Sequence, residues 1–181
     1  FERVIRLSEE ALRERPDLLI WPEAAVPELL RWDEFTYTTI SGLARSNATW
    51  MIFGADDAEP GDPPGRNDRY YNSAWLMDAE GHLRATYRKQ HLVAFGEEVP
   101  FVRWLPFLKW FTPITGAFTR GTNFTPFAVS DLEVEATPLI CFEDVFPHLA
   151  RRAVQPTTDF LVNLTNDGWF REGAAQRQQA A

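Results

Sequence analysis

Three residues of this chain carry the chemical groups that a nucleophilic acyl-transfer site requires. Cys141 is the only cysteine, and it stands where the apolar run 138–140 stops and acidic residues begin. A thiol that attacks a carbonyl needs a base to remove its proton, and a cation or N–H groups to hold the oxyanion. Glu23 and Lys89 provide a carboxylate and an ammonium, and each lies just beyond a segment with the pattern of a buried strand. We therefore predict a nucleophile, a base and an electrostatic partner at these positions.

Each of the three residues also has an ordinary structural interpretation. Cysteine is among the most often buried residue types, so Cys141 beside two aliphatic residues can be an inert core residue. Lys89 and Glu23 can be solvated charges at strand ends. Together, however, the three residues supply nucleophile, base and electrophile, which is a more specific pattern than any one of them.

Histidine does not provide a better partner for the thiol. His82 lies in a turn, His91 is a possible pocket residue, and His148 begins a helix, and none has an obvious orienting acid. Three scattered histidines and one cysteine also make no metal-ligand spacing. We expect neither a metal site nor a cofactor.

The elements that would position these residues alternate between helix and strand. Apolar residues recur at helical spacing from Phe1 to Leu12, a pattern that Pro16 ends, and helical patterns return at 31–47 and 147–154. Segment 56–68 is a loop on composition, rich in Asp, Pro and Gly. Strands are predicted at 18–21, 50–54, 70–77, 83–87, 133–140 and 159–164, the third and fourth forming a hairpin.

This alternation predicts an α/β layered fold, because several strands are apolar on both faces. If the strands share a sheet, Glu23, Lys89, Cys141 and the loop 166–170 all emerge at carboxyl ends of strands, where open α/β sheets place their sites. We therefore expect the three chemical groups to meet in space.

Composition limits the classes of function. A chain of 181 residues, 45% of them hydrophobic, can bury one substantial core, and its net charge of −8 argues against nucleic acid as a partner. No stretch approaches the roughly 20 apolar residues that span a bilayer. The chain begins at Phe1, without a methionine and inside an apparent helix, which suggests a segment of a longer protein.

The residues around the three chemical groups resemble those of a known family. The match to the carbon-nitrogen hydrolase (nitrilase) superfamily, and within it to the bacterial apolipoprotein N-acyltransferase family, extends from about Leu18 to Phe170. Two residues depart from the family pattern: Ala94 replaces a usual proline and Phe142 a common tyrosine. The matching motifs are Trp-Pro-Glu at 21–23, Tyr-Asn-Ser-Ala at 71–74, Lys-Gln-His-Leu-Val-Ala-Phe-Gly-Glu at 89–97, Ile-Cys-Phe-Glu at 140–143 and Asn-Asp-Gly-Trp-Phe at 166–170.

The resemblance implies a four-layer αββα sandwich and a ping-pong mechanism through a thioester. In that mechanism Glu23 takes the proton of Cys141, and the thiolate attacks an ester carbonyl of a phospholipid. Lys89 and the backbone N–H of Phe142 hold the oxyanion. The N-terminal amine of a diacylglyceryl-cysteine apolipoprotein then attacks the thioester and forms an amide.

The resemblance also assigns supporting roles. Glu97 and Glu143 would hold Lys89 or shape the pocket, and Trp169 would form a wall of the acyl site. Ordinary surface carboxylates and a core tryptophan are the alternatives.

The family further implies a location and missing parts. Residues 1–181 would be a fragment of the catalytic domain, incomplete at both ends, of a protein of the bacterial inner membrane with this domain on the periplasmic face. Independently of the family, segment 99–126 mixes seven aromatic residues with Arg103, Lys109 and Arg120 and has no acidic residue. Such a composition suits a membrane-interfacial arm. An aromatic loop folded onto the core of the protein would have the same composition.

Two other functions stay open at this point. A soluble amidase of the same superfamily would use the same Glu-Lys-Cys triad, with water instead of an amine resolving the thioester. A non-catalytic binding domain could retain the fold, although the intact Glu23, Lys89 and Cys141 argue against it.

Overall fold

The computed structural model describes residues 1–93, 97 and 118–166. Trp169, most of the loop 166–170 and the part of segment 99–126 before residue 118 lie outside the described residues. The helices and strands are α1 (Glu2–Ala11), β1 (Leu18–Ile20), α2 (Glu34–Asn47), β2 (Trp50–Glu59), β3 (Arg69–Met77), β4 (Leu83–Arg88), β5 (Phe127–Val129), β6 (Val134–Ile140), α3 (Pro147–Ala153) and β7 (Phe160–Leu164).

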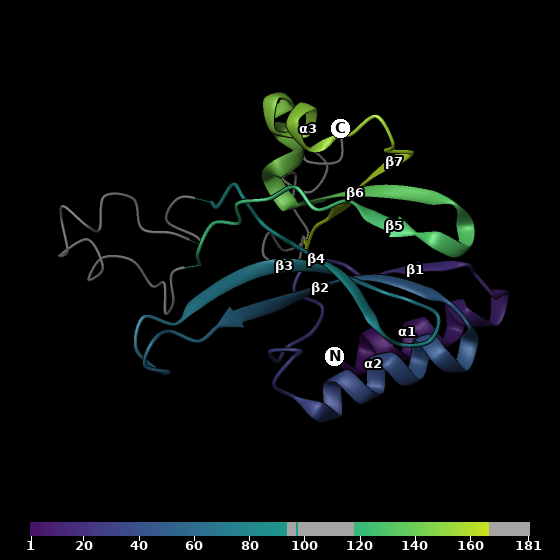
Figure 1. Cartoon of the computed structure of the whole chain (residues 1–181). Coiled ribbons are helices and arrows are strands. Elements are labelled where there is room, and N and C mark those ends of the chain that lie inside the picture. The colour runs from purple at the N-terminus through teal and green to yellow at the C-terminus, as the bar shows by residue number, and fades with distance from the viewer. Residues whose placement is uncertain (94–96, 98–117, 167–181) are drawn as a thin grey trace, which may run out of the picture.

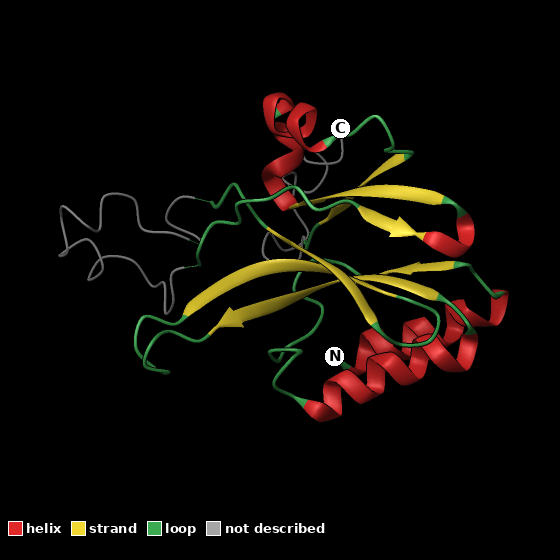
Figure 2. Cartoon of the chain, in the orientation of Figure 1, coloured by secondary structure: helices red, strands yellow, loops and turns green. Residues whose placement is uncertain are grey.

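The strands form two sheets that face each other between layers of helix (Figure 1). One sheet has the order β1-β2-β3-β4 and the other the order β5-β6-β7. Helices α1 and α2 cover the outer face of the first sheet, and α3 lies on the outer side of the second (Figure 2). The expected four-layer αββα sandwich is therefore confirmed.

Strand β2 shows why both faces of the first sheet are apolar. Trp50 and Ile52 pack between the two sheets, in one core cluster with Val129 and Ile140. The alternate residues Met51 and Phe53 belong to the second core cluster, against the helices. Because successive side chains of a strand point to opposite faces, a central strand buried on both sides reads as a continuous apolar run.

The predicted loop 56–68 begins too early. Strand β2 continues to Glu59, paired in register with β3, and Asp57 is 2% exposed. The Asp57 carboxylate accepts hydrogen bonds from Arg88 of β4, with Nη2 to Oδ2 at 2.6 Å. This ion pair allows an acidic residue to continue a strand, which composition alone does not predict. The three-residue strand β5 was also not predicted.

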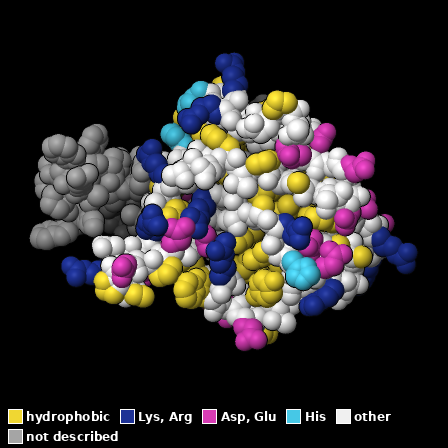
Figure 3. Space-filling model, in the orientation of Figure 1, with side chains coloured by type: hydrophobic (Ala, Val, Ile, Leu, Met, Phe, Trp, Pro, Cys, Tyr) yellow, Lys and Arg dark blue, Asp and Glu magenta, His cyan; other side chains and the backbone are white. Residues whose placement is uncertain are grey.

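The surface of the described residues carries mixed charge. Figure 3 shows acidic and basic side chains interspersed over the face in view. Among the residues that the structure describes, Trp32, just before α2, and Phe35, in its first turn, are the most exposed large hydrophobic residues, at 62% and 74%. Among the described residues, no helix has both the length and the apolar character needed to cross a bilayer.

Candidate active site

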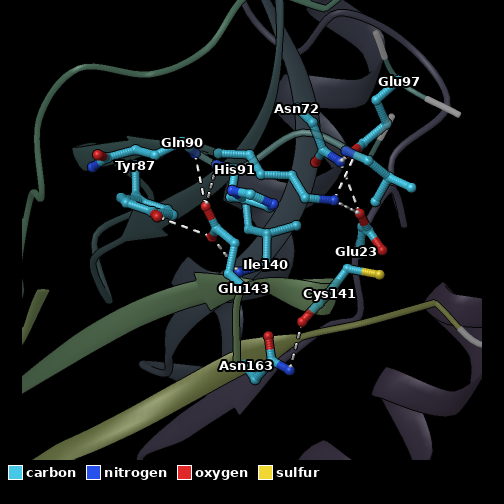
Figure 4. Close-up of polar contacts among 12 residues, drawn as sticks. Glu23, Asn72, Tyr87, Gln90, His91, Glu97, Ile140, Cys141, Glu143 and Asn163 are labelled. Carbon is cyan, nitrogen blue, oxygen red and sulfur yellow. Dashed lines mark hydrogen bonds and ion pairs between the residues drawn. The ribbon is translucent and has the colours of Figure 1, made fainter. Parts of the chain in front are cut away.

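Glu23, Lys89 and Cys141 come together where three strands end, and Figure 4 shows Glu23 and Cys141 side by side. Strand β1 runs parallel to β2, and β3 is antiparallel to both β2 and β4, so β1 and β4 point the same way. Glu23 and Lys89 therefore follow strands whose carboxyl ends lie at the same end of the first sheet. Cys141 follows β6 of the facing sheet. The residues meet across two sheets, and not within one as the simplest reading of the strand pattern supposed.

A glycine fixes the turn that carries Glu23. The backbone N–H of Gly54 donates to the carbonyl of Pro22 at 3.2 Å, and the N–H of Ala25 donates to the carbonyl of Gly54 at 3.0 Å. A Cβ atom at Gly54 would lie 2.6 Å from the Cα of Glu23, closer than real side chains approach. The turn therefore packs directly on the backbone of β2, and Glu23 is only 7% exposed.

Lys89 is a buried cation held by two carboxylates. Its side chain is 1% exposed, and its Nζ lies 3.2 Å from Glu23 Oε1 and 2.9 Å from Glu97 Oε1. Burial would lower the pKa of Lys89, but the charges of Glu23 and Glu97 outweigh burial and raise it. Lys89 therefore stays charged and acts as an electrostatic group, since it holds its proton too firmly to be a base.

Asn72 of β3 joins the same two carboxylates. Its Nδ2 donates to Glu23 Oε1 and to Glu97 Oε1, each at 2.8 Å. Glu97 also accepts from the backbone N–H of Val93 through its Oε2, at 2.9 Å. The structure therefore places Glu97 against Lys89, where the resemblance expects a supporting acid.

Cys141 occupies a strained turn directly after β6. Its φ angle is 54°, in the left-handed region that residues with a Cβ rarely adopt. Asn163 of β7 donates to the Cys141 carbonyl at 3.1 Å and to Asp144 at 2.6 Å, so the turn is tied to the neighbouring strand. Strain of this kind persists only where the surroundings enforce it.

The resting thiol keeps its proton. Burial and then the negative charge of Glu23 raise the pKa of Cys141, while Lys89 and contacts with Thr165 and the backbone of Phe142 act in the opposite direction. A protonated thiol is a weak nucleophile and requires a base at the moment of attack. Figure 4 shows the Cys141 sulfur on the side of the Glu23 carboxylate, the group that can serve as that base.

Glu143 joins the loop after β4 to the turn that carries the thiol. It is fully buried, and its Oε1 accepts from the backbone N–H groups of Gln90 and His91 at 2.7 and 3.0 Å. Its Oε2 accepts from the Tyr87 hydroxyl at 2.9 Å and from the Ile140 N–H at 2.8 Å. Burial raises the pKa of Glu143, against the effect of these four donors. Its surroundings are those of a structural carboxylate and not of a surface residue.

Asp56 is a further carboxylate beside the site. It is half-buried, pairs in register with Asn72 and points to the inter-sheet side of β2. Burial, followed by the charges of Glu23 and Glu97, raises the pKa of Asp56 to about 6. Sequence reasoning placed Asp56 in a loop and gave Asn72 no role, although Asn72 lies within the matching motif 71–74.

The described end of segment 99–126 contacts the domain. The backbone N–H of Gly121 donates to the Lys89 carbonyl at 2.8 Å. The Phe124 ring stacks on Tyr87, with centroids 6.5 Å apart. The membrane-interfacial role of the segment stays a prediction, as does the role of Trp169.

Comparison with known proteins identifies the family. The model of the carbon-nitrogen hydrolase family matches residues 1–181. This chain belongs to the carbon-nitrogen hydrolase family. The family assignment agrees with the expectation drawn from the Glu-Lys-Cys motifs.

Two curated relatives of this chain carry the same name. The chain is 38% identical over 175 residues to an apolipoprotein N-acyltransferase of Geobacter metallireducens, covering 96% of this chain and 32% of the relative. It is 36% identical over 176 residues to an apolipoprotein N-acyltransferase of Brucella suis, with 94% and 32% coverage. The chain thus spans about a third of the length of these curated relatives.

Solved structures share the fold. A carbon-nitrogen hydrolase from Helicobacter pylori G27 superposes with a TM-score of 0.67 at 21% identity, covering 99% of this chain and 60% of that one. An amidase from Nesterenkonia sp. AN1, in which acrylamide has added to the active-site cysteine, gives a TM-score of 0.60 at 19% identity, with 98% and 65% coverage. At these identities the likeness shows the fold alone.

Proposed function

We propose that this chain belongs to the catalytic domain of an apolipoprotein N-acyltransferase, with Cys141 as nucleophile, Glu23 as general base and Lys89 as oxyanion partner. The observation that carries the proposal is the meeting of these three side chains at strand ends, in a chain 36–38% identical to proteins of that name.

In the first half-reaction, Glu23 takes the proton of the Cys141 thiol, and the sulfur attacks the ester carbonyl of a phospholipid. The charge on the carbonyl oxygen is held by Lys89 and by the N–H of Phe142, which contacts the thiol. The carbon–oxygen bond to the glycerol then breaks, and the departing oxygen takes the proton from Glu23. A lysophospholipid leaves, and the acyl chain stays on Cys141 as a thioester.

In the second half-reaction, the N-terminal amine of a diacylglyceryl-cysteine apolipoprotein attacks the thioester. Glu23 accepts a proton of the amine, the carbon–sulfur bond breaks, and the same proton passes from Glu23 to the leaving thiolate, which restores the thiol of Cys141 and the carboxylate of Glu23. The thioester separates one difficult ester-to-amide exchange into two easier steps. As part of this proposal, the full-length protein lies in the bacterial inner membrane, with the domain on the periplasmic face.

A transfer assay tests the proposal. The full-length protein is incubated with phosphatidylethanolamine vesicles and a peptide whose N-terminal cysteine carries diacylglycerol, and the peptide is weighed by mass spectrometry. We expect a third acyl chain on the peptide, and none with Cys141→Ala. Hydrolysis of small amides without transfer to the peptide would refute the proposal in favour of a soluble amidase.

A further inference from the structure

Asn72 lies at the centre of a buried polar cluster that it forms with Glu23, Lys89 and Glu97. Its side chain is 6% exposed, and its Nδ2 contacts the same two oxygen atoms, Glu23 Oε1 and Glu97 Oε1, that Lys89 Nζ contacts. Two donors therefore alternate with two acceptors around one small cluster (Figure 4). Buried networks of this kind fix the positions of their members when every group is satisfied.

The two carboxylates differ in their second oxygen atom. Glu97 Oε2 accepts from the Val93 N–H at 2.9 Å, so both of its oxygens are engaged. Glu23 Oε2 accepts no hydrogen bond from the part of the chain that the structure describes, and Figure 4 shows it directed toward the Cys141 sulfur. A base needs a free lone pair facing the proton that it removes. Among the described contacts, Glu23 Oε2 meets this requirement, whereas each oxygen of Glu97 already accepts at least one hydrogen bond.

The charges around Asn72 explain why an amide is suited to this position. Lys89 is the ammonium that contacts the two carboxylates, Asp56 is the register partner of Asn72 on β2, and the Cys141 thiol faces the cluster from the turn after β6. An uncharged donor adds a hydrogen bond to Glu23 without cancelling the negative charge that a base requires.

We infer that Asn72 is a positioning residue, whose amide holds Glu23 Oε1 beside Lys89 so that Glu23 Oε2 stays directed at the thiol. The backbone carbonyl of Asn72 also accepts a hydrogen bond from the backbone N–H of Lys89 at 2.9 Å. One residue of β3 thus sets the positions of both the base and the cation. The inference rests on the proposed function in one respect, because it takes Glu23 as the base.

A double-mutant cycle tests whether Asn72 acts through Glu23. Acylation of the full-length protein by p-nitrophenyl butyrate is followed as a burst of nitrophenolate in the wild type, Asn72→Leu, Glu23→Gln and the double variant. Leucine is close to asparagine in shape but donates no hydrogen bond. We expect Asn72→Leu to lower the acylation rate constant about 100-fold with the KM for the ester changed by less than about threefold. In the Glu23→Gln background the same substitution should cost less than about threefold.

Two controls keep the result interpretable. Ser73→Ala changes the next buried residue of β3, whose side chain lies on the opposite face of the sheet, and should leave acylation within about twofold of the wild type. Asn72→Asp keeps the shape of the side chain but replaces the donor with an acceptor, and should lose at least as much rate as Asn72→Leu.

The outcomes separate the inference from the proposed function. Full activity of Asn72→Leu, or an equal loss in both backgrounds, would overturn the inference and leave Glu23 as the base. Unchanged acylation in Glu23→Gln would overturn the base assignment and the inference with it. Because the nitrophenyl ester is not a lipid, acylation of Cys141 by this probe does not depend on the natural acyl donor.

Discussion

Glu143→Gln should destabilise the protein by about 2 kcal/mol, although the change removes only one charge and leaves the shape almost unaltered. Glu143 accepts four hydrogen bonds, two at each oxygen. The glutamine side chain keeps one oxygen atom, which still accepts from the N–H groups of Gln90 and His91. Its NH₂ group then replaces the oxygen that faced Ile140 and Tyr87. The Tyr87 hydroxyl can rotate and accept, but the Ile140 N–H then faces another donor.

The magnitude follows from these contacts. A buried N–H without an acceptor costs about 1–3 kcal/mol, and the remaining bonds weaken because their acceptor is no longer charged. Against this, a neutral side chain avoids the free-energy cost of burying a charge, which is the effect that raises the pKa of Glu143. The net loss is about 2 kcal/mol. Because Ile140 precedes the nucleophile, we also expect acylation of Cys141 to slow about tenfold or more.

Chemical unfolding followed by tryptophan fluorescence measures the change in stability. Tyr87→Phe removes one of the four donors and should cost about 1 kcal/mol, less than Glu143→Gln. Glu80→Gln makes the same chemical change at an exposed position, and should alter stability by less than about 0.5 kcal/mol. If Glu143→Gln were as stable as the wild type, the four contacts would not hold the turn as described.

Three further predictions concern the site. Gly54→Ala should cost about 2 kcal/mol of unfolding free energy and slow ester acylation, because its Cβ would meet the backbone of Glu23; unchanged unfolding would contradict the packing. Asp56→Asn should stabilise the protein by about 1 kcal/mol at pH 8 in chemical unfolding. Its raised pKa of about 6 means that the ionised carboxylate costs stability above pH 6, so the gain should vanish near pH 4. Glu23→Gln removes a charge that raises the pKa of Cys141, so iodoacetamide should alkylate the thiol faster at pH 8 while acylation by esters slows; slower alkylation would contradict this electrostatic account.

Much of the site can be predicted from the sequence, because the ends of strands can be recognised in it. Glu23 and Cys141 follow apolar runs and Lys89 follows the second strand of a recognisable hairpin, and the direction of a strand determines which residue appears at its carboxyl end. The four-layer arrangement, by contrast, came from the family resemblance. Periodicity shows that β2 is buried on both faces, but it does not show whether a helix or a second sheet covers each face.

The remaining residues of the site depend on contacts between distant segments. Asn72 gains its role from the register of β3, which places its amide between Glu23 and Glu97. Asp56 lies in a segment whose composition favours a loop, and the ion pair of the neighbouring Asp57 with Arg88 and the pairing with β3 allow the strand to continue. Neither the register nor the ion pair can be read from one sequence in isolation.

Mass measurement of the acyl-enzyme is the most direct test of the central claim that Cys141 carries the acyl group. The full-length protein is incubated with phosphatidylethanolamine vesicles without an acceptor, digested, and the modified peptide is located by tandem mass spectrometry. The account predicts one fatty-acyl mass on Cys141 that neutral hydroxylamine removes, and no adduct in Cys141→Ala. An acyl group on another residue would contradict it, as would an unmodified Cys141 in a protein that acylates the diacylglyceryl peptide in a parallel reaction.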